Sequence, residues 1–279
     1  MPMVKEEKEL RDEVVVEPRP SKLDPPLSDP LIFCPVNPLL VLAARVFKAR
    51  KNLRPLGPAK VYSFRHQGRK LSMIGPGMGA PLAVYLLERA IANGARRVIL
   101  FGICGSVHPE VRIGDVVVPT EALIDEGTSR NYVSGAKRAL PSESAVAAIR
   151  KALDSSAKSY HLGPIWTTDA VFRETKSKVK ACGERGVLAV EMEASALFTV
   201  ARYRGIELGA IMVVSDELFD LRWHPGFARP RFISALNHAL RIARNAALVM
   251  AGAEPEAGAE RAEEETPASA EAGPEATGE

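Results

Sequence analysis

The chain has 279 residues, of which 46% are hydrophobic and 25% are charged, and its formal net charge is +3. This length and apolar content allow a sizeable core in one large domain or two small ones, and they exclude a fibrous protein. No segment reaches the roughly 18 uninterrupted apolar residues of a membrane helix, and the N-terminal stretch is charged where a signal peptide is apolar, so we expect a cytoplasmic protein without a membrane partner.

The two ends of the chain differ in composition from its middle. Residues 1–30 hold a run of charges and then a proline-rich stretch, which predicts a flexible arm without regular helix. Residues 251–279 hold nine Glu and one Arg, with no aromatic side chain and no aliphatic one larger than Ala, which predicts a disordered acidic tail. Between them, residues 31–250 are expected to form one domain.

The charge of the chain is divided unevenly. The acidic tail carries −8, which leaves +11 for the remainder. A basic body suits an anionic ligand, but a solvated basic surface is the commoner explanation, and without a recognisable binding motif we expect no nucleic-acid partner. The cysteines Cys34, Cys104 and Cys182 have no C-x-x-C spacing and no histidine cluster beside them, so we interpret them as small hydrophobic residues and expect no metal site.

Within residues 31–250, short apolar runs alternate with segments of helical periodicity. Strands are expected at residues 31–34, 60–66, 70–75, 96–102, 114–127 and 207–218. Helices are expected at residues 81–94, 142–156, 191–205 and 232–250, the second with a serine and a glutamate placed as in a helix cap. This alternation predicts an α/β fold of three layers, α/β/α, with a central, mostly parallel (mixed) sheet whose ligand site lies beyond the carboxyl ends of the strands.

Four segments place glycine or polar residues directly after a buried strand. They are GPGMGAP (75–81), GICGS (102–106), VEMEAS (190–195) and VVSDEL (213–218). Glycines allow a ligand to approach the backbone, and a helix N-terminus offers free N–H groups to oxygen atoms. Each segment also has a structural explanation, because glycine turns bend chains, acidic residues favour helix N-termini and Asp caps helices.

The order and separation of these segments carry a resemblance. GPGMGAP, GICGSVHPEVRIGDVVVP, VLAVEMEASALF and VVSDEL together closely resemble the nucleoside phosphorylase family, which includes uridine phosphorylases, hexameric purine nucleoside phosphorylases and methylthioadenosine/adenosylhomocysteine nucleosidases. The resemblance covers about residues 31–250, and DEGTSRNY and WTTDAVFRET look like a less characterised branch. It implies a phosphorylase/hydrolase-like fold and cleavage of a nucleoside N-glycosidic bond by phosphate or water.

The resemblance also implies roles for single residues. Glu193 is expected to bind the ribose hydroxyls, with Met192 packing beneath the ring and Glu191 beside them, and a carboxylate that accepts from two hydroxyls fixes the sugar by charge-assisted bonds. Asp216, preceded by Ser215, matches the acid that purine-cleaving members use on the leaving base, which favours a purine-type substrate. The further expected substrate-binding positions are Gly77, Gly102, Gly105, Phe172 and Arg173.

The expected base site differs from that of uridine phosphorylases. Phe172 is expected to form an aromatic wall, and either Arg173 or Glu174 to contact the base edge. The glutamine and arginine with which uridine phosphorylases bind uracil fall near Thr175 and Ser177, so we do not expect uracil recognition of that kind.

The expected phosphate site departs most from the family. Phosphorolytic relatives follow their first strand with a Gly-Asp-Pro-x-Arg turn, whereas this chain reads VNPLL, with Leu40 in place of the arginine. A second arginine that binds phosphate in relatives aligns with Leu100, and the hydroxyl residue of the glycine turn aligns with Ile103. Three apolar side chains cannot compensate the charge of a phosphate dianion. The phosphate ligands are therefore left open, with weak candidates in Arg45, Arg65, Thr128 and Arg130.

The sequence as a whole predicts a nucleoside phosphorylase, a pentosyltransferase that uses inorganic phosphate as cosubstrate and no cofactor. Two alternatives remain, namely a phosphate-independent nucleosidase that hydrolyses the same bond and a non-catalytic nucleoside-binding protein. By resemblance we expect a homo-oligomer, a dimer or a trimer of dimers, in which a neighbour completes the site. His66 is a candidate for the donated residue, and the alternative is a solvent-facing hairpin histidine.

Overall fold

The computed structural model describes residues 8–9, 13–156 and 159–254. Its α-helices are α1 (Asn37–Val46), α2 (Ala80–Ala92), α3 (Glu143–Asp154), α4 (Lys176–Glu184), α5 (Ala194–Arg204) and α6 (Pro230–Met250), and two 3-10 turns are η1 (Ser129–Asn131) and η2 (Val171–Arg173). Its strands are β1 (Lys8–Glu9), β2 (Leu31–Phe33), β3 (Arg50–Lys51), β4 (Lys60–His66), β5 (Arg69–Gly75), β6 (Arg97–Ser106), β7 (Val116–Asp125), β8 (Val133–Ser134), β9 (Arg138–Ala139), β10 (His161–Thr168), β11 (Ala189–Glu191), β12 (Glu207–Glu217) and β13 (His224–Pro225).

The central sheet is mixed, and its strands fall into two parallel groups. β2, β5, β6 and β12 form one group, and β7, β10 and β11 form the other. The groups meet antiparallel where β11 pairs with β6 and where β12 pairs with β7. Because β12 pairs with both β6 and β7, the five strands β6, β12, β7, β10 and β11 close into a ring.

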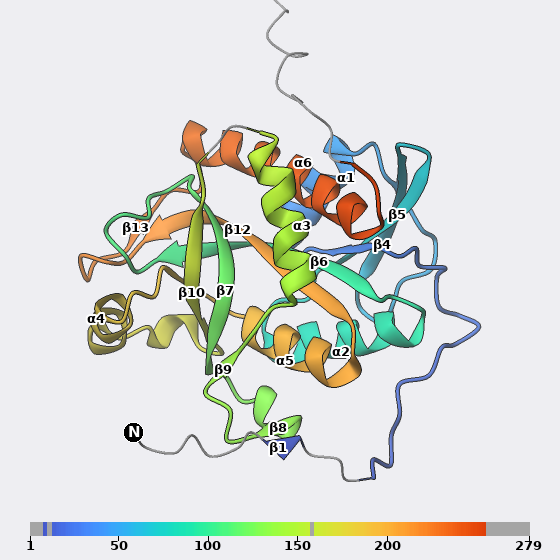
Figure 1. Cartoon of the computed structure of the whole chain (residues 1–279), viewed down its shortest axis with the longest axis horizontal. Coiled ribbons are helices and arrows are strands. Elements are labelled where there is room, and N and C mark those ends of the chain that lie inside the picture. The colour runs from blue at the N-terminus through green and yellow to red at the C-terminus, as the bar shows by residue number, and fades with distance from the viewer. Residues whose placement is uncertain (1–7, 10–12, 157–158, 255–279) are drawn as a thin grey trace, which may run out of the picture.

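Helices cover the sheet on both sides, as the predicted three-layer α/β/α fold requires. α2 and α5 pack against each other below the sheet in Figure 1, whereas α1 and α6 lie above it. α3 packs against α6 and β12. The predicted mixed sheet between helical layers is confirmed, and the closure of five strands into a ring adds to it. Within the described residues, no helix is both long and apolar enough to cross a membrane.

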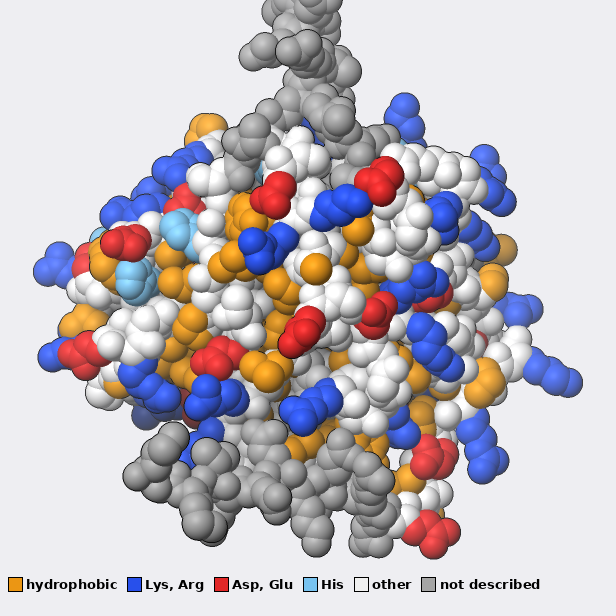
Figure 2. All heavy atoms as spheres, viewed as in Figure 1, with side chains coloured by type: hydrophobic (Ala, Val, Ile, Leu, Met, Phe, Trp, Pro, Cys, Tyr) orange, Lys and Arg blue, Asp and Glu red, His pale blue; other side chains and the backbone are white. Residues whose placement is uncertain are grey.

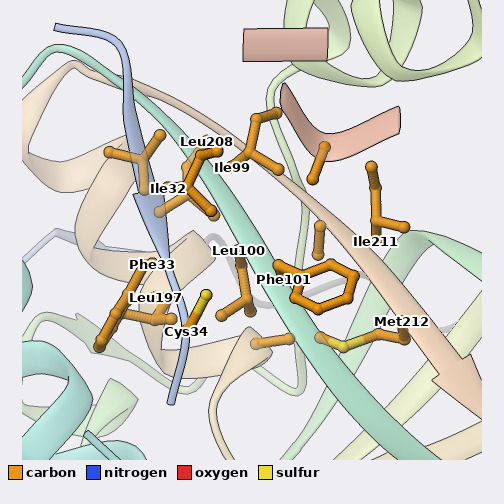
Figure 3. Close-up of a cluster of buried hydrophobic side chains, with 14 of the residues drawn as sticks. Ile32, Phe33, Cys34, Ile99, Leu100, Phe101, Leu197, Leu208, Ile211 and Met212 are labelled. Carbon is orange, nitrogen blue, oxygen red and sulfur yellow. The ribbon is translucent and has the colours of Figure 1, made fainter. Parts of the chain in front are cut away.

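The core lies between β6, its neighbours and the helices on either side. Phe33, Leu100 and Leu197 are buried side chains from β2, β6 and α5 that lie together in Figure 3. Burial of one large apolar side chain contributes about 1.5–3 kcal/mol to folding. Leu100, which stands where phosphorolytic relatives place an arginine, is therefore part of the hydrophobic core.

The cysteines were interpreted from the sequence as small hydrophobic residues, and the structure shows how far each of them is buried. All three are free thiols, and Cys34 and Cys104 are buried while Cys182 is half-buried. Burial raises the pKa of the Cys34 thiol to about 12, so this side chain is a neutral, inert hydrophobe at physiological pH.

Residues 13–30 contain no helix, as their prolines predict, but they are fastened to the body at two carboxylates. Asp24 forms an ion pair with Arg89 and accepts a hydrogen bond from Asn93 Nδ2 at 2.9 Å. Asp29 accepts from the backbone N–H groups of Arg96 at 3.0 Å and Arg97 at 2.7 Å. This part of the expected arm is thus anchored, and the expected acidic tail lies outside the described residues apart from 251–254.

The predicted cap of α3 has a different role. Ser142 occupies the N-cap position, but its hydroxyl makes no capping hydrogen bond to the helix. Instead, Ser142 Oγ accepts from the backbone N–H of Leu208 at 2.9 Å, while the N–H of Ser142 donates to the Leu208 carbonyl at 2.9 Å. The serine therefore joins the start of α3 to β12.

Candidate active site

Three neighbouring strands bring the predicted site segments into one row. Asp216 on β12 pairs with Gly105 on β6, and Gly105 pairs with Val190 on β11. Neighbouring strands lie about 4.8 Å apart, so the backbones that carry Asp216 and Val190 are separated by about 10 Å. Glu191 follows Val190 directly, so the structure places the VEMEAS and VVSDEL carboxylates on the two sides of the GICGS strand, at a separation on the scale of a nucleoside.

Glu191 is a buried carboxylate whose two oxygens are both used within the protein. Thr167 Oγ1 donates to its Oε1 at 2.5 Å, and the backbone N–H groups of Glu193 and Ala194 donate to its Oε2 at 2.7 and 2.8 Å. Burial raises the pKa of Glu191, while these donors lower it. Glu191 thus holds the N-terminus of α5, where a negative charge is favourable, and its contact with substrate stays a prediction.

Glu193 is the carboxylate that remains available to a ligand. It is buried at the N-cap position of α5, and its Oε1 accepts from the backbone N–H of Gly79 at 2.5 Å. Gly79 has a φ of +87°, which favours glycine, and it precedes α2. Glu193 therefore joins the starts of two helices, and within the described part of the chain its Oε2 accepts no hydrogen bond.

The electrostatic surroundings of Glu193 favour hydroxyl donors. Burial raises the pKa of this carboxyl, the negative charge of Glu191 raises it further, and the Gly79 N–H lowers it. A ligand hydroxyl that donates to Oε2 stabilises the ionised form and so offsets the cost of burial. Met192, half-buried, lies between the two carboxylates in sequence, where the sugar ring is expected.

Asp216 lies at a bulge near the end of β12, because the pairing with β6 shifts between Val214 and Asp216. Ser215 Oγ donates to Asp216 Oδ1 at 2.6 Å, and the indole N–H of Trp223 donates to Oδ2 at 3.0 Å. Burial raises the pKa of Asp216, and the two donors lower it. Sequence reasoning missed Trp223, because its distance along the chain from Asp216 gives no sign of this contact.

The two glycines of GICGS do not form the bend that the sequence suggested, because β6 runs through both of them as a continuous strand. Their role is to make room. A Cβ atom on Gly105 would lie 2.6 Å from Leu218 Cδ1 and 3.0 Å from Asp216 Oδ2, and one on Gly102 would lie 2.8 Å from Met212 Sδ. Gly105 is thus part of the site, whereas Gly102 serves the packing of β6 against β12.

Gly77 also serves packing rather than a ligand. A Cβ atom there would lie 2.6 Å from Leu86 Cδ1 and 2.8 Å from Phe33 Cζ, while the backbone N–H of Gly77 donates to the Pro35 carbonyl at 2.9 Å. Gly77 therefore holds the loops after β2 and β5 together, and its contact with substrate stays a prediction. Gly79, two residues later, is the glycine of this segment that reaches the site.

At the base end, the structure brings Glu174 close to Asp216. Burial and the negative charge of Asp216 raise the pKa of Glu174 to about 7. Phe172 is 96% exposed and Arg173 is exposed as well, so η2 does not place them against the other site residues in this structure. The aromatic side chain beside Asp216 is Trp223, which is 63% exposed.

Two of the arginines considered for phosphate lie away from the row. α1 begins at the site edge with Asn37, and Arg45 is eight residues further along it, about 12 Å away. Arg65 and His66 lie in the β4–β5 hairpin, at the opposite end of β5 from Gly75, about 20 Å away. Within one chain, neither Arg45 nor Arg65 reaches the site, and a role of His66 at a neighbouring copy stays a prediction.

The turn that carries Thr128 and Arg130 already holds an internal anion. The buried carboxylate of Glu126 accepts from the backbone N–H groups of Thr128 and Ser129, and from Ser195 Oγ at 3.1 Å. This turn lies beside α5, but its backbone donors are used by Glu126. Arg130 is exposed next to it.

Another basic side chain, Lys60, lies at the end of the sheet that carries the site. Lys60 pairs with Gly75, the last residue of β5, and its Nζ donates to Asn37 Oδ1 at 2.9 Å. Asn37 is the first residue of α1 and belongs to the VNPLL segment, which the resemblance aligns with a phosphate-binding turn. The β4–β5 register could not be read from composition, so sequence reasoning missed Lys60. Among the residues that the structure describes, no three His, Cys, Asp or Glu side chains are grouped as a metal site requires.

Similar sequences are found among proteins named as nucleoside phosphorylases. Guanosine phosphorylase from Halorubrum lacusprofundi is 32% identical over 159 residues, which make up 57% of this chain and 66% of that protein. A DeoD-type purine nucleoside phosphorylase from Bacillus cytotoxicus is 33% identical over 158 residues, 55% of this chain and 66% of that protein. The matched region thus spans just under two thirds of the length of these relatives.

The fold and the family are shared over a longer stretch. Uridine phosphorylase from Vibrio fischeri has a crystal structure that superposes with a TM-score of 0.72 at 22% identity, covering 80% of this chain and 93% of that one. This likeness shows a common fold. The family model described as the phosphorylase superfamily matches residues 32–249. The chain belongs to the phosphorylase superfamily.

Proposed function

We propose that this protein is a nucleoside phosphorylase, a pentosyltransferase that cleaves a purine-type nucleoside to the free base and ribose 1-phosphate. The observation that carries the proposal is the pair of carboxyl groups, Glu193 with an oxygen left for a ligand and Asp216 on the far side of β6. The relatives named guanosine phosphorylase and purine nucleoside phosphorylase support the purine preference.

The two carboxyl groups divide the reaction between them. Glu193 accepts hydrogen bonds from the ribose hydroxyls and holds the sugar, which becomes positively charged as the bond to the base lengthens. The electron pair of that bond passes to the base, and Asp216, with its pKa raised by burial, donates a proton or a hydrogen bond to it. Phosphate then attacks the anomeric carbon from the opposite face, which completes ribose 1-phosphate.

Inorganic phosphate is the cosubstrate in this proposal, and no cofactor takes part. Lys60 and Asn37 lie at the turn that corresponds to the family phosphate site, so they are the side chains that we assign to the anion. The runner-up is a nucleosidase that uses water, and the observation that favours it is the full burial of Leu40 and Leu100 where relatives place arginines.

The experiment that tests the proposal separates the two nucleophiles. Purified protein is incubated with guanosine, inosine, adenosine and uridine, each with and without phosphate, and ribose 1-phosphate, ribose and free base are measured. We expect ribose 1-phosphate from guanosine or inosine, and no cleavage without phosphate. Ribose released in phosphate-free buffer assigns the nucleosidase activity, and binding without cleavage assigns a non-catalytic binding protein.

A variant pair tests the assignment of the anion site. Lys60→Gln removes the cation beside Asn37 and is expected to raise the KM for phosphate about tenfold, because one charge-assisted contact to phosphate is lost. Lys51→Gln is the matched control, since Lys51 is an exposed lysine on the adjacent strand β3. An equal KM in both variants contradicts the role of Lys60.

We also propose that the protein is a cytoplasmic homo-oligomer. Met78, just before α2, and Leu82 and Tyr85 in its first turns are exposed apolar side chains next to the site, which supports contact with a second copy there. Free cysteines are typical of a reducing compartment. Sedimentation velocity is expected to show a dimer or a trimer of dimers, and Leu82→Glu is expected to dissociate it.

A small-molecule ligand fits the surface better than a nucleic acid does. On the face shown in Figure 2, Lys and Arg side chains are scattered, with Asp and Glu side chains between them. A nucleic-acid partner is bound by basic side chains gathered on one face or stripe. We therefore propose a nucleoside, and no nucleic acid, as the partner of this chain.

A further inference from the structure

Trp223 lies in the segment between β12 and α6 and contacts the acid of the proposed site. It directly precedes β13, whose residue Pro225 pairs with Asp216 across the two strands. Its indole Nε1 donates to Asp216 Oδ2 at 3.0 Å, although the side chain is 63% exposed. The other tryptophan, Trp166, also donates to a carboxylate at 3.0 Å, that of Asp125, but it is 2% exposed.

The two donors to Asp216 differ in how easily they can leave. Ser215 is buried at the bulge, and its Oγ lies 2.6 Å from Asp216 Oδ1 and 3.2 Å from the Cys104 carbonyl oxygen, so it contacts Asp216 from within the protein. Trp223 reaches Oδ2 from the solvent side. A base that approaches Asp216 from the same side therefore competes with the indole N–H for Oδ2.

We propose that Trp223 is a positioning residue, which orients the Asp216 carboxyl in the empty site and gives up Oδ2 to the base when a nucleoside binds. The inference rests on the proposed function, because it takes the ligand of Asp216 to be the base. The loss of the indole contact accompanies the binding of the base. The exposed indole ring then lies free to cover the base.

The groups around Asp216 determine how this contact depends on pH. Glu174 faces it from the segment after η2, and Cys104 faces it from β6 with a thiol whose pKa burial and Asp216 raise. In the Trp223 segment, Asp220 and His224 bond to each other at 2.7 Å, and Arg222 is exposed.

Removal of the indole N–H changes the pKa of Asp216 in a defined direction. This donor stabilises the ionised carboxylate and so lowers the pKa of Asp216, against the effect of burial. Trp223→Phe therefore raises the pKa of Asp216, and the form that can donate a proton persists to higher pH.

Fluorescence tests the contact itself. The chain has two tryptophans, so Trp166→Phe leaves Trp223 as the reporter. We expect its emission to change with pH as Asp216 gains a proton, and to change when guanosine is added. Asp216→Asn abolishes the pH transition and Glu174→Gln keeps it. If Trp166→Phe does not fold, the same transition is read from the difference between the wild-type protein and Asp216→Asn.

The pH dependence of the reaction tests the role. In Trp223→Phe, the alkaline limb of kcat/KM for guanosine phosphorolysis is expected to move up by about one pH unit, because a hydrogen bond to a carboxylate has been removed. Trp166→Phe is the matched control, since it removes an indole–carboxylate bond of the same length, to Asp125 instead of Asp216, and it is expected to keep the alkaline limb of the wild type.

The outcomes are distinct from those of the proposed function. The inference is overturned if the alkaline limb is unchanged in Trp223→Phe, or if the Trp223 emission changes neither with pH nor in Asp216→Asn. Either result leaves cleavage by the wild-type protein unaffected. If no nucleoside is cleaved, the proposed function fails, and the emission decides the inference alone: guanosine that binds without changing it overturns the role of Trp223.

Discussion

At the scale of single residues, two glutamates separated by one residue have different roles because their hydrogen bonds differ. Glu191 is saturated by Thr167 and by the N-terminus of α5. Glu193 accepts one backbone N–H and keeps an oxygen free. The motif VEMEAS shows two acids, but which of them faces a ligand depends on where α5 begins.

This division predicts opposite effects of two conservative variants. Glu193→Gln is expected to lower kcat/KM at least about 100-fold, because the charge that meets the sugar is lost, while thermal unfolding stays near the wild type at pH 6. Glu191→Gln is expected to lower stability by about 1 kcal/mol, because an anion at the start of α5 is lost, with a smaller loss of activity. Equal losses of activity in both variants contradict the assignment.

The raised pKa of Glu193 also predicts a pH-dependent stability. A carboxyl whose pKa is higher in the folded than in the unfolded protein stabilises the fold at low pH and loses that contribution as pH rises through the folded pKa. The Tm of the wild type is therefore expected to fall above the ordinary titration range of glutamate, and Glu193→Gln to reduce this fall. Differential scanning calorimetry between pH 5 and pH 9 measures it.

At the scale of elements, the contact between β6 and β12 sets the shape of the site. The bulge at Ser215 turns Asp216 toward Gly105, and Gly105 leaves room for its carboxyl. Gly102 lies on the same strand and leaves room for Met212 instead. The two glycines are thus a natural pair for separating site geometry from core packing.

We predict that Gly105→Ala reduces activity more than Gly102→Ala does. The added methyl of Gly105→Ala displaces Asp216 Oδ2, and a misplacement of about 1 Å costs on the order of 100-fold in rate. That of Gly102→Ala meets the sulfur of Met212, so it costs about 1–3 kcal/mol of stability by overpacking and leaves the carboxyl in place. Steady-state kinetics and chemical unfolding of both variants compare the two effects.

The sequence predicted elements well where the apolar pattern is regular, and less well where proline and glycine interrupt it. The strand expected at residues 60–66 is β4, and the helix expected at 232–250 is α6, which begins two residues earlier. β10 was missed, because Gly163 and Pro164 break its apolar run at the point where its pairing with β7 shifts. α1 was missed as well, because the VNPLL segment was interpreted only as a turn.

For the site, the motifs supplied the carboxyl groups but not their partners. Glu193 and Asp216 follow from the family pattern, whereas Trp223 and Lys60 depend on strand pairing between segments that the motifs do not include. The structural roles of three motif residues have the same origin. Glu191, Gly77 and Gly102 belong to motif segments, yet their surroundings in three dimensions use them for capping and packing.

At the scale of the whole molecule, the segment before β2 is bound to both ends of the domain. Asp29 accepts from the backbone of Arg96 and Arg97 and pairs with the Arg97 guanidinium at 2.7 Å. Arg97 in turn donates to the carbonyl of Met250, the last residue of α6. One carboxylate therefore connects the N-terminal segment, the start of β6 and the end of the domain.

Asp29→Ala is accordingly expected to destabilise the entire domain. Loss of an acceptor that serves two backbone N–H groups and a guanidinium costs about 1–3 kcal/mol, which lowers the Tm by roughly 2–10 °C for a domain of this size. The control is Glu110→Ala, which removes an exposed carboxylate. A drop in Tm no larger than that of the control shows that the segment before β2 is not anchored in solution.

The closed ring of strands has a consequence for motion. The amides of β6 and β12 that are bonded inside the ring have no free edge from which to open, so we expect their hydrogen exchange to require global unfolding. The segment that carries Trp223 lies outside the ring, so we expect its amides to exchange by local opening. Asp216 sits at the border between the two. We therefore expect slow hydrogen exchange in the strand that carries the acid and fast exchange in the segment that contacts it, so that a ligand can be admitted without any loosening of that strand.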